Sequence, residues 1–140
     1  MDIKELIPQR DPFLFIDHIE DVQKEEIIVS KTYSKDLDFF KGHFPDNPIV
    51  PGVILTEHCF QSGAALIAKN SDGIQNSLAV VTRIQSAKFK NLVKPDEKIT
   101  TATKLVEMMG QTAFFRSVST NENKKKVLIL EFACTLVDKS

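Results

Sequence analysis

The sequence predicts an α+β domain in which a curved antiparallel sheet wraps one long, buried helix. One stretch, from 52 to about 70, is apolar around most of its circumference, as a buried helix is. Six other stretches carry the short apolar or alternating runs that are typical of strands. The last three follow one another with short polar turns between them, so we expect them to pair as an antiparallel meander. The whole chain, 1–140, is predicted to form one domain.

The predicted strands differ in pattern along the chain. They span, in order, 13–22, 25–33, 78–90, 97–108, 111–119 and 127–137. The first contains Phe-Leu-Phe-Ile before it turns polar, the second carries Ile-Ile-Val followed by alternation, and the third alternates in part. Gly110 and the polar run 121–126 separate the last three strands, as hairpin turns would.

The helix is predicted to begin after Pro51 and to end near Asn70. It is more apolar than one small sheet should require, so we expect a second subunit to cover part of it. Three consecutive small residues, Gly63, Ala64 and Ala65, are expected to let another backbone approach closely.

Composition and charge exclude several classes of protein. Hydrophobic content of 42% and charged content of 26% are ordinary for a globular domain, and a net charge of −1 gives no overall attraction to nucleic acid. No apolar run approaches the roughly 18 residues that a membrane span needs. The N-terminal residues have no apolar signal core. Cys59 and Cys134 lack metal-ligand spacing, so we expect two reduced, buried thiols, no metal and a cytoplasmic protein.

The stretch 42–57 carries candidate groups for acid–base chemistry. His43 lies on a loop that three prolines stiffen, and histidine is the residue type best suited to act as a general base near neutral pH. Glu57 lies one turn inside the apolar helix, where burial should raise its pKa and make it a proton donor. Gln61, four residues on, is placed to hydrogen-bond the Glu57 carboxyl group.

Each of these features also has a purely structural explanation. Glu57 could face a solvent crack or pair with a lysine, and a loop histidine is more often a surface residue than a catalyst. His18 and His58 have no supporting context, so we expect both to be surface or structural residues. The first N–H groups of the helix, at Gly52 and Val53, have no intrahelical partners and could hold a thioester carbonyl as it becomes an enolate. Simple solvation of these groups is the alternative.

The spacing in 42–57 resembles the signature of the 3-hydroxyacyl-acyl-carrier-protein dehydratases. It reads Gly-His-Phe-Pro, two residues, Pro-Ile, one residue, Pro-Gly-Val, three residues and Glu. Segments 6–17 and 84–96 are similar to other parts of that family, so the resemblance covers nearly the whole chain. It implies a hot-dog fold, with the helix inside the curved sheet, and a homodimer with two active sites at its interface, often assembled as a trimer of dimers. No cofactor is implied.

The same resemblance assigns roles to individual residues. By position, His43 matches the catalytic histidine and Glu57 the catalytic carboxylate, the two coming from opposite subunits. Gly52 matches the backbone donor to the thioester carbonyl, and the match continues through Gln61. Glutamate rather than aspartate at position 57 favours the plain dehydratase over the dehydratase-isomerase branch.

Several parts of the chain depart from the family or add to it. Gln9 and Asp11 stand where the family usually has histidine and an aromatic residue, and 78–83 lacks the aromatic residue often found at the substrate tunnel. Four basic residues form a group, here called the basic cluster, that could receive an acidic carrier protein. They are Arg83, Lys88, Lys90 and Lys94. A lysine-protected strand edge is an equal alternative. We expect the lysine run, 124–126, to be a solvated turn.

The sequence therefore predicts a dehydratase. Its substrate would be a 3-hydroxyacyl thioester on an acyl carrier protein, its product the trans-2-enoyl thioester, and its pathway fatty-acid biosynthesis. The alternatives are a specialised dehydratase of a polyene, polyketide or modified-lipid pathway, a hot-dog thioesterase, and a non-catalytic acyl-thioester-binding protein. No nucleic-acid partner and no membrane span are expected.

Overall fold

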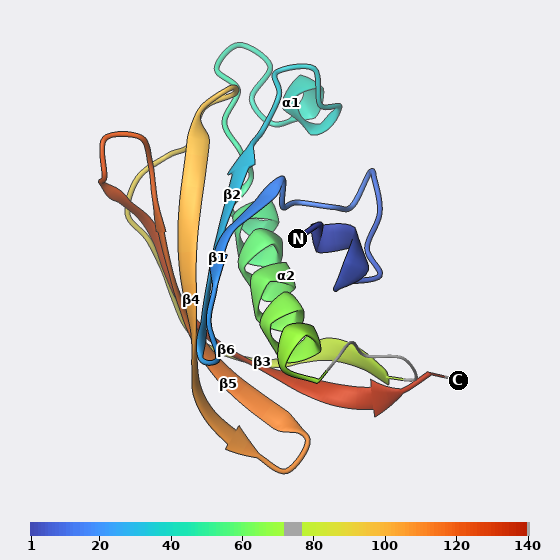
Figure 1. The fold of residues 1–140 in the computed structure, drawn as a ribbon. Helices are drawn as coiled ribbons and strands as arrows, with labels where there is room; N and C mark the ends of the chain where they lie inside the picture. The colour runs from blue at the N-terminus through green and yellow to red at the C-terminus, as the bar shows by residue number, and fades with distance from the viewer. Residues whose placement is uncertain (72–76, 140) are drawn as a thin grey trace.

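A computed structural model describes residues 1–71 and 77–139 of this chain. Within these residues one curved, six-stranded sheet wraps a long helix, which confirms the predicted α+β class and the hot-dog architecture (Figure 1). The strands are β1 (His18–Val22), β2 (Glu26–Thr32), β3 (Ser77–Phe89), β4 (Lys98–Met109), β5 (Thr112–Thr120) and β6 (Lys126–Asp138). The helical segments are η1 (Ile3–Glu5), α1 (Phe39–Gly42) and α2 (Gly52–Asn70). No helix in the described residues is long and apolar enough to span a membrane.

The sheet has the strand order β1-β2-β4-β5-β6-β3, and all neighbouring strands are antiparallel. The predicted meander is confirmed, because β4, β5 and β6 are consecutive both in the chain and in the sheet. Gly110, with a φ of 61°, makes the tight turn between β4 and β5, where a residue with a Cβ would be strained. Strand β3 follows α2 in the chain and forms one edge of the sheet, beside β6.

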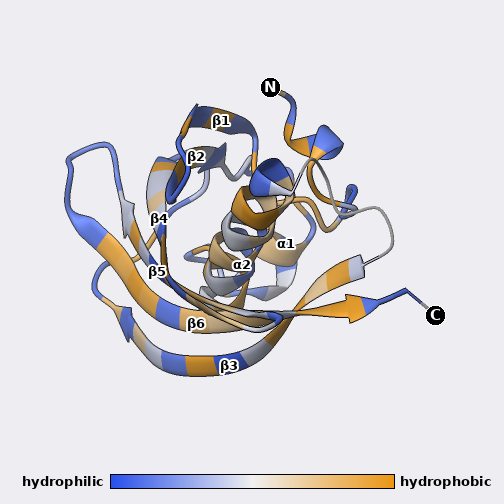
Figure 2. Ribbon diagram, turned by 60° about the horizontal axis from the view of Figure 1, so that its bottom comes forward, coloured by the Kyte–Doolittle hydropathy of each residue, from blue (hydrophilic) through white to orange (hydrophobic). Residues whose placement is uncertain are grey.

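The long helix, α2, has the predicted bounds and lies in the concave face of the sheet (Figure 2). Leu55, Cys59 and Leu66 are among its buried side chains and belong to the main core. Its first turn is more open, since Val53 is 74% exposed. The core therefore covers the middle and the C-terminal part of α2 and leaves its N-terminal end accessible.

The small residues of α2 face this chain's own sheet. A Cβ on Gly63 would lie 3.2 Å from ring atoms of Phe115 on β5 and Phe132 on β6, and those two rings stack 5.3 Å apart. Ala64 and Ala65 are buried within the same chain. The expected close approach at Gly63 is made by aromatic rings of the same chain and not by another backbone. The small residues let the helix approach the aromatic layer of its own sheet.

The first predicted strand is wrong over its N-terminal half. Only His18–Val22 pairs with β2, whereas 13–22 was the predicted range. The backbone N–H of Phe15 and the carbonyl of Phe13 instead bond to the side chain of Gln61 on α2. The apolar run in this segment therefore packs on the helix, because the helix supplies the hydrogen bonds that a neighbouring strand would otherwise supply.

Buried hydroxyl groups join α2 to the sheet beneath it. Two rows run from the helix to β4 and β5, His58–Thr101–Ser119 and Ser62–Thr103–Ser117, with contacts of 2.6–2.8 Å. Nδ1 of His58 faces the carbonyl oxygen of Phe15 at 2.7 Å, so Nδ1 carries the hydrogen and Nε2 accepts from the Thr101 hydroxyl. Burial lowers the pKa of His58 to about 4 and keeps the ring neutral. The expected structural role of His58 is confirmed.

Candidate active site

Glu57 lies in the second turn of α2, half-buried at the side of a pocket of about 340 Å³. The rest of the lining comes from four parts of the chain: Gln9 and Phe13, Phe60 and Ala64 of α2, Ala79, Val80 and Val81 of β3, and Cys134 of β6. Most of these side chains are apolar. Burial raises the pKa of Glu57, and the hydrogen bond from Gln61 offsets part of that rise. The predicted direction of the pKa shift is confirmed, and a carboxyl group in this position can hold a proton for donation.

Gln61 fixes the orientation of Glu57. Its Oε1 accepts from the N–H of Phe15 at 2.9 Å, and its Nε2 donates to the carbonyl of Phe13 at 2.9 Å and to Oε2 of Glu57 at 3.0 Å. A backbone N–H only donates and a carbonyl only accepts, so these partners determine which way the amide faces. Oε2 of Glu57 is therefore an acceptor, and the proton of neutral Glu57 is held on Oε1.

His43 follows the short helix α1 and is half-buried on the proline-rich loop. Its Nδ1 lies 3.0 Å from the carbonyl oxygen of Ile49. Because that carbonyl can only accept, Nδ1 carries the hydrogen and Nε2 has its lone pair free. The ring packs beside Phe44, with 4.3 Å between the ring centroids. This arrangement holds the imidazole in the tautomer that a general base needs.

The N-terminus of α2 provides two unused donors. The N–H groups of Gly52 and Val53 have no hydrogen-bond partner among the residues that the structure describes. The preceding loop is held to the body of the protein by the N–H of Val50, which donates to the carbonyl of Val93 at 2.8 Å. A Cβ on Gly52 would lie 3.1 Å from the ring of Phe89, so glycine allows that ring to pack beside the first turn of the helix.

His43 and Glu57 do not meet within one chain. No hydrogen bond joins them, and His43 is absent from the lining of the Glu57 pocket. Gly52 and Val53 likewise lie outside that lining. The structure therefore brings Glu57 and Gln61 together and leaves His43 on a separate part of the chain.

Sequence reasoning missed most of the apolar lining of the Glu57 pocket. Phe60 and Ala64 lie three and seven residues after Glu57, on the same face of α2, so helical spacing could have identified them. Cys134 gave no such signal, because only the pairing of β6 with β3 places it there. Burial raises the pKa of Cys134 to about 12, so it lines the pocket as a neutral thiol. Both cysteines are free and buried, as expected.

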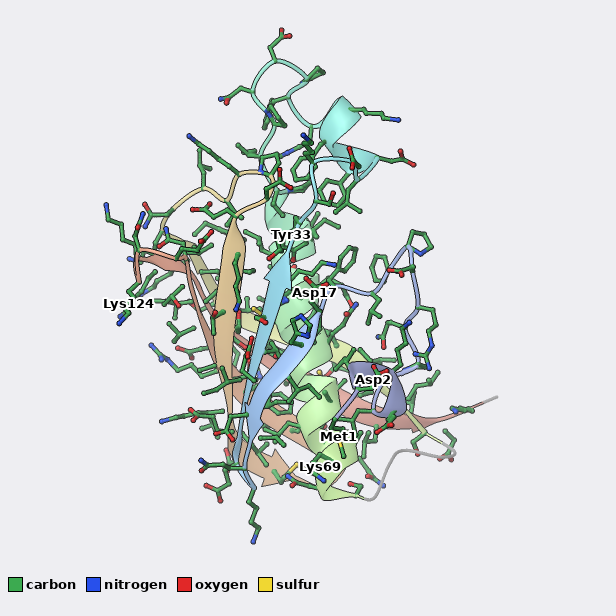
Figure 3. All side chains as sticks on the ribbon, turned by 45° about the horizontal axis from the view of Figure 1, so that its top comes forward. Met1, Asp2, Asp17, Tyr33, Lys69 and Lys124 are labelled. Carbon is green, nitrogen blue, oxygen red and sulfur yellow. The ribbon has the colours of Figure 1, made fainter. Side chains whose placement is uncertain are left out.

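The basic cluster lies along β3 and the segment that follows it, and all four side chains are exposed. None of the four forms an ion pair in the described part of the chain. The lysine run occupies the turn between β5 and β6, where Lys124 projects outward (Figure 3). The two groups of lysines therefore lie on different elements.

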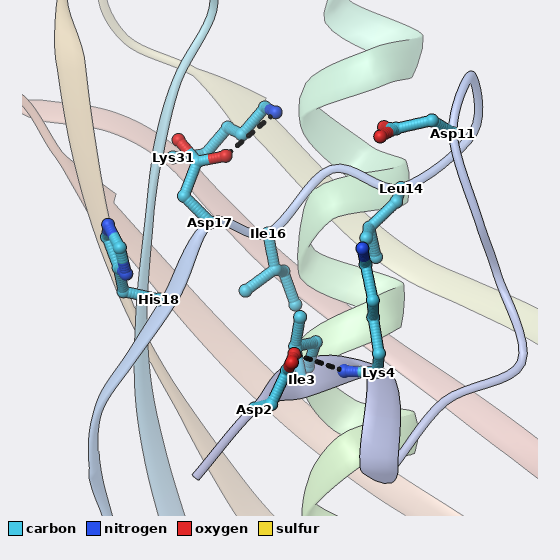
Figure 4. Close-up of a pocket in the computed structure, with 9 residues that line it drawn as sticks. All are labelled: Asp2, Ile3, Lys4, Asp11, Leu14, Ile16, Asp17, His18 and Lys31. Carbon is cyan, nitrogen blue, oxygen red and sulfur yellow. Dashed lines mark hydrogen bonds and ion pairs between the residues drawn. The ribbon is translucent and has the colours of Figure 1, made fainter.

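A second, polar pocket of about 440 Å³ lies between the N-terminal segment and β1 and β2 (Figure 4). Three of its charged side chains have partners: Nζ of Lys31 lies 3.0 Å from Oδ1 of Asp17, and Oδ1 of Asp2 accepts from the backbone N–H of Lys4 at 2.9 Å. Neither His43 nor Glu57 lines it. Among the described residues, no group of three or more His, Cys, Asp or Glu side chains is placed to hold a metal ion.

Comparison with known proteins identifies the family. Residues 19–128 match the family model described as ApeI-like, ApeI dehydratase. A 3-hydroxyacyl-acyl-carrier-protein dehydratase FabZ of Halalkalibacterium halodurans is 37% identical over 88% of each chain, and the FabZ of Enterococcus faecalis is 33% identical over 89% of this chain and 86% of its own. The chain belongs to the FabZ and ApeI-like dehydratases. This dehydratase is accordingly a hydro-lyase, and the predicted family and enzyme class are confirmed.

Solved structures confirm the fold of the dehydratase. The dehydratase heterocomplex ApeI:P from Xenorhabdus doucetiae contains a chain that superposes with a TM-score of 0.83 at 10% identity, covering 99% of this chain and 93% of that one. A hypothetical thioesterase from Streptococcus pneumoniae, solved with coenzyme A, matches with a TM-score of 0.66 at 16% identity, covering 87% and 86%. At these identities the likeness concerns the fold alone.

Proposed function

We propose that this dehydratase acts on a 3-hydroxyacyl thioester linked to an acyl carrier protein and releases the trans-2-enoyl thioester in fatty-acid biosynthesis. The observation that carries the proposal is Glu57, a half-buried carboxyl group that Gln61 orients at an apolar pocket. Elimination from such a substrate needs a proton donor beside a pocket that takes a hydrocarbon chain, and the lining provides both. The names of the FabZ relatives point to the same substrate class.

The proposed mechanism is an elimination across C2 and C3. Nε2 of His43 takes the C2 proton, and the N–H of Gly52, assisted by that of Val53, stabilises the negative charge that develops on the thioester oxygen. Glu57 donates the proton on Oε1 to the C3 hydroxyl. The C3–O bond then breaks, water leaves and the C2–C3 double bond forms. Glu57 ends as a carboxylate and His43 as an imidazolium, and a net proton transfer from His43 to Glu57 restores both.

A homodimer is part of this proposal. Strand β3 is a 13-residue edge with exposed apolar side chains, among them Ile84 and Phe89, each 53% exposed. An edge of this kind offers unpaired backbone groups and apolar surface to a second copy of the chain. A dimer would also bring His43 of one subunit to the Glu57 pocket of the other. The proposed mechanism needs this arrangement, because His43 does not line the Glu57 pocket of its own chain. We further propose that three such dimers can assemble into a hexamer.

The carrier protein is proposed to dock at the basic cluster. These four exposed cations, without ion-pair partners in the described residues, suit an acidic surface. We also propose that the protein works in the cytoplasm, on the basis of its two buried free thiols.

One specific observation favours a second candidate, a specialised dehydratase of a polyene, polyketide or modified-lipid pathway. The matching family model is the ApeI-like one, and the ApeI:P chain covers nearly the whole fold. That protein is a heterocomplex, so an unlike second subunit is the alternative partner under this candidate. The chemistry assigned to Glu57 and His43 is the same in both candidates.

Incubation with a 3-hydroxyacyl thioester tests the proposal. Growth of enoyl absorbance without release of free thiol is the expected result, and loss of His43 should reduce turnover by at least a hundredfold, the usual effect of removing a general base. Release of free thiol would instead indicate a thioesterase. Binding without either product would indicate a non-catalytic protein. Comparing carriers and acyl chains from different pathways then separates the two dehydratase candidates.

A further inference from the structure

Gln9 has a buried acceptor without a donor. Its Oε1 is buried and forms no hydrogen bond, and it is one of only two such side-chain atoms among the described residues. A buried amide oxygen without a partner is destabilising, and such atoms are rare in folded proteins. Gln9 also lines the Glu57 pocket, whose other lining residues are mostly apolar. Gln9 therefore brings an unsatisfied acceptor to the wall of this pocket, and a rotation of its side chain would present that oxygen to a ligand donor.

The backbone around Gln9 is held in place. Arg10 donates from Nη1 to the carbonyl oxygens of Ile7 and Gln9, both at 2.7 Å, and from Nη2 to that of Lys4 at 2.9 Å. Ile7 is itself buried in the core. The backbone of the segment that carries Gln9 is therefore held against the body of the protein beside the pocket.

No other group in the pocket supplies the missing donor. Both hydrogens of the Gln61 amide are used, one by Phe13 and one by Glu57. Neither Glu57 nor the Cys134 thiol forms a hydrogen bond with Gln9 Oε1. The lining groups of this chain therefore leave Gln9 Oε1 available to a donor on a ligand.

The substrate class of the proposed function has one such donor near its reacting carbons. The thioester group offers only acceptors and the acyl chain offers neither donors nor acceptors, whereas the C3 hydroxyl carries one O–H. That hydroxyl must receive a proton from Glu57 and needs an acceptor for its own hydrogen. We propose that Gln9 Oε1 accepts a hydrogen bond from the C3 hydroxyl of the substrate and so turns a lone pair of that hydroxyl toward Glu57. This inference rests on the proposed function for the identity of the ligand.

The first experiment measures binding without turnover. In a His43→Ala background, the affinity for a 3-hydroxyacyl pantetheine thioester is compared with that for the saturated thioester of the same chain length. The protein with Gln9 should prefer the hydroxylated ligand by roughly tenfold, as expected for one hydrogen bond to a buried acceptor. Gln9→Met has nearly the same shape without the acceptor, so its preference should fall to about one. Gln111→Met, a change at an exposed glutamine in the β4–β5 turn, should keep the preference.

The second experiment measures turnover in the chain with His43 present. Gln9→Met should lower kcat/KM by roughly tenfold for dehydration and by the same factor for the reverse hydration, because both directions pass through one transition state. If Gln9→Met does not fold, Gln9→Asn withdraws the same amide by one carbon and should give the same losses. Equal weakening of both ligands, or no change in either, would overturn the assignment. If the preference for the hydroxylated ligand depends on Gln9 but even the protein with both His43 and Gln9 does not dehydrate the substrate, Gln9 is the hydroxyl-binding residue and the proposed reaction is wrong.

Discussion

His58 is expected to make the stability of the fold depend on pH in a way that one substitution can isolate. The neutral ring donates from Nδ1 to the carbonyl of Phe15 and accepts at Nε2 from the hydroxyl of Thr101. Protonation would put a second hydrogen on Nε2 and a charge into the core, so the folded state resists it. His58→Asn keeps a donor near the position of Nδ1, removes the acceptor and removes the titration.

The size of the effect follows from the pKa. Burial lowers the pKa of His58 to about 4 from an ordinary value of 6.5. The unfolded chain then binds more protons than the folded chain wherever the pH lies below about 6.5, so stability is fully present above that value and falls as the pH drops toward 4. At 1.36 kcal/mol for each pH unit, this amounts to about 3 kcal/mol of unfolding free energy between pH 7 and pH 4.

The assay is urea unfolding from pH 7 to pH 4 at one fixed protein concentration, since the unfolding of an oligomer depends on concentration. At pH 7, His58→Asn should be the less stable protein by about 1–3 kcal/mol, because the Thr101 hydroxyl loses its acceptor. Toward pH 4 this difference should shrink or reverse, since only the chain with His58 pays the cost of protonation. Carboxyl groups titrate in both proteins and cancel in the difference. A difference that stays constant over this pH range would refute the reasoning.

Three further predictions concern the site and the core. His43→Ala and Glu57→Gln should each be folded and nearly inactive, yet a mixture of the two should recover about a quarter of normal activity, since half of its dimers are mixed and each has one complete site; an inactive mixture with confirmed subunit exchange would exclude a shared site. Gly63→Val should lower the free energy of unfolding by about 1–3 kcal/mol, because the new side chain would clash with the rings of Phe115 and Phe132. Denaturant titration should detect that loss. Charge reversal in the basic cluster should raise KM for a carrier-linked substrate but not for a pantetheine thioester, whereas reversal in the lysine run should change neither. Equal losses on both substrates would mean that the basic cluster shapes the active site itself.

The pattern of apolar and polar residues predicted the structure correctly wherever contacts between residues near one another in the chain determine it. The bounds of α2 follow from Pro51 and from its apolar circumference, and the meander of β4, β5 and β6 follows from short turns between alternating stretches. The bond between Glu57 and Gln61 follows from a spacing of four residues on one helix. These features depend on contacts within a helical turn or between adjacent strands, and the spacing of apolar and polar residues along the chain reflects such contacts.

The sequence pattern gave wrong predictions where the structure depends on which of several distant segments packs against a given surface. The apolar run that contains Phe13 and Phe15 has the composition of a strand, but the Gln61 amide takes its backbone groups and holds it on the helix. The small residues around Gly63 allow a close approach, and only the packed structure shows that the partner is the aromatic layer of the same chain.

The sequence by itself determined the helix, the meander, the family signature and the chemical types of the acid and the base. Only the tertiary structure decided that Gln61 bonds both to the N-terminal segment and to Glu57, and so fixes the orientation of the Glu57 carboxyl group. It also decided that β3 is an edge strand of the sheet and that Gln9 and Glu57 line the same pocket. The physical reason is that periodicity reports which side of an element is apolar but not which other element covers that side. That choice depends on packing and hydrogen bonding between segments as far apart in the chain as Phe13, Gln61 and Cys134.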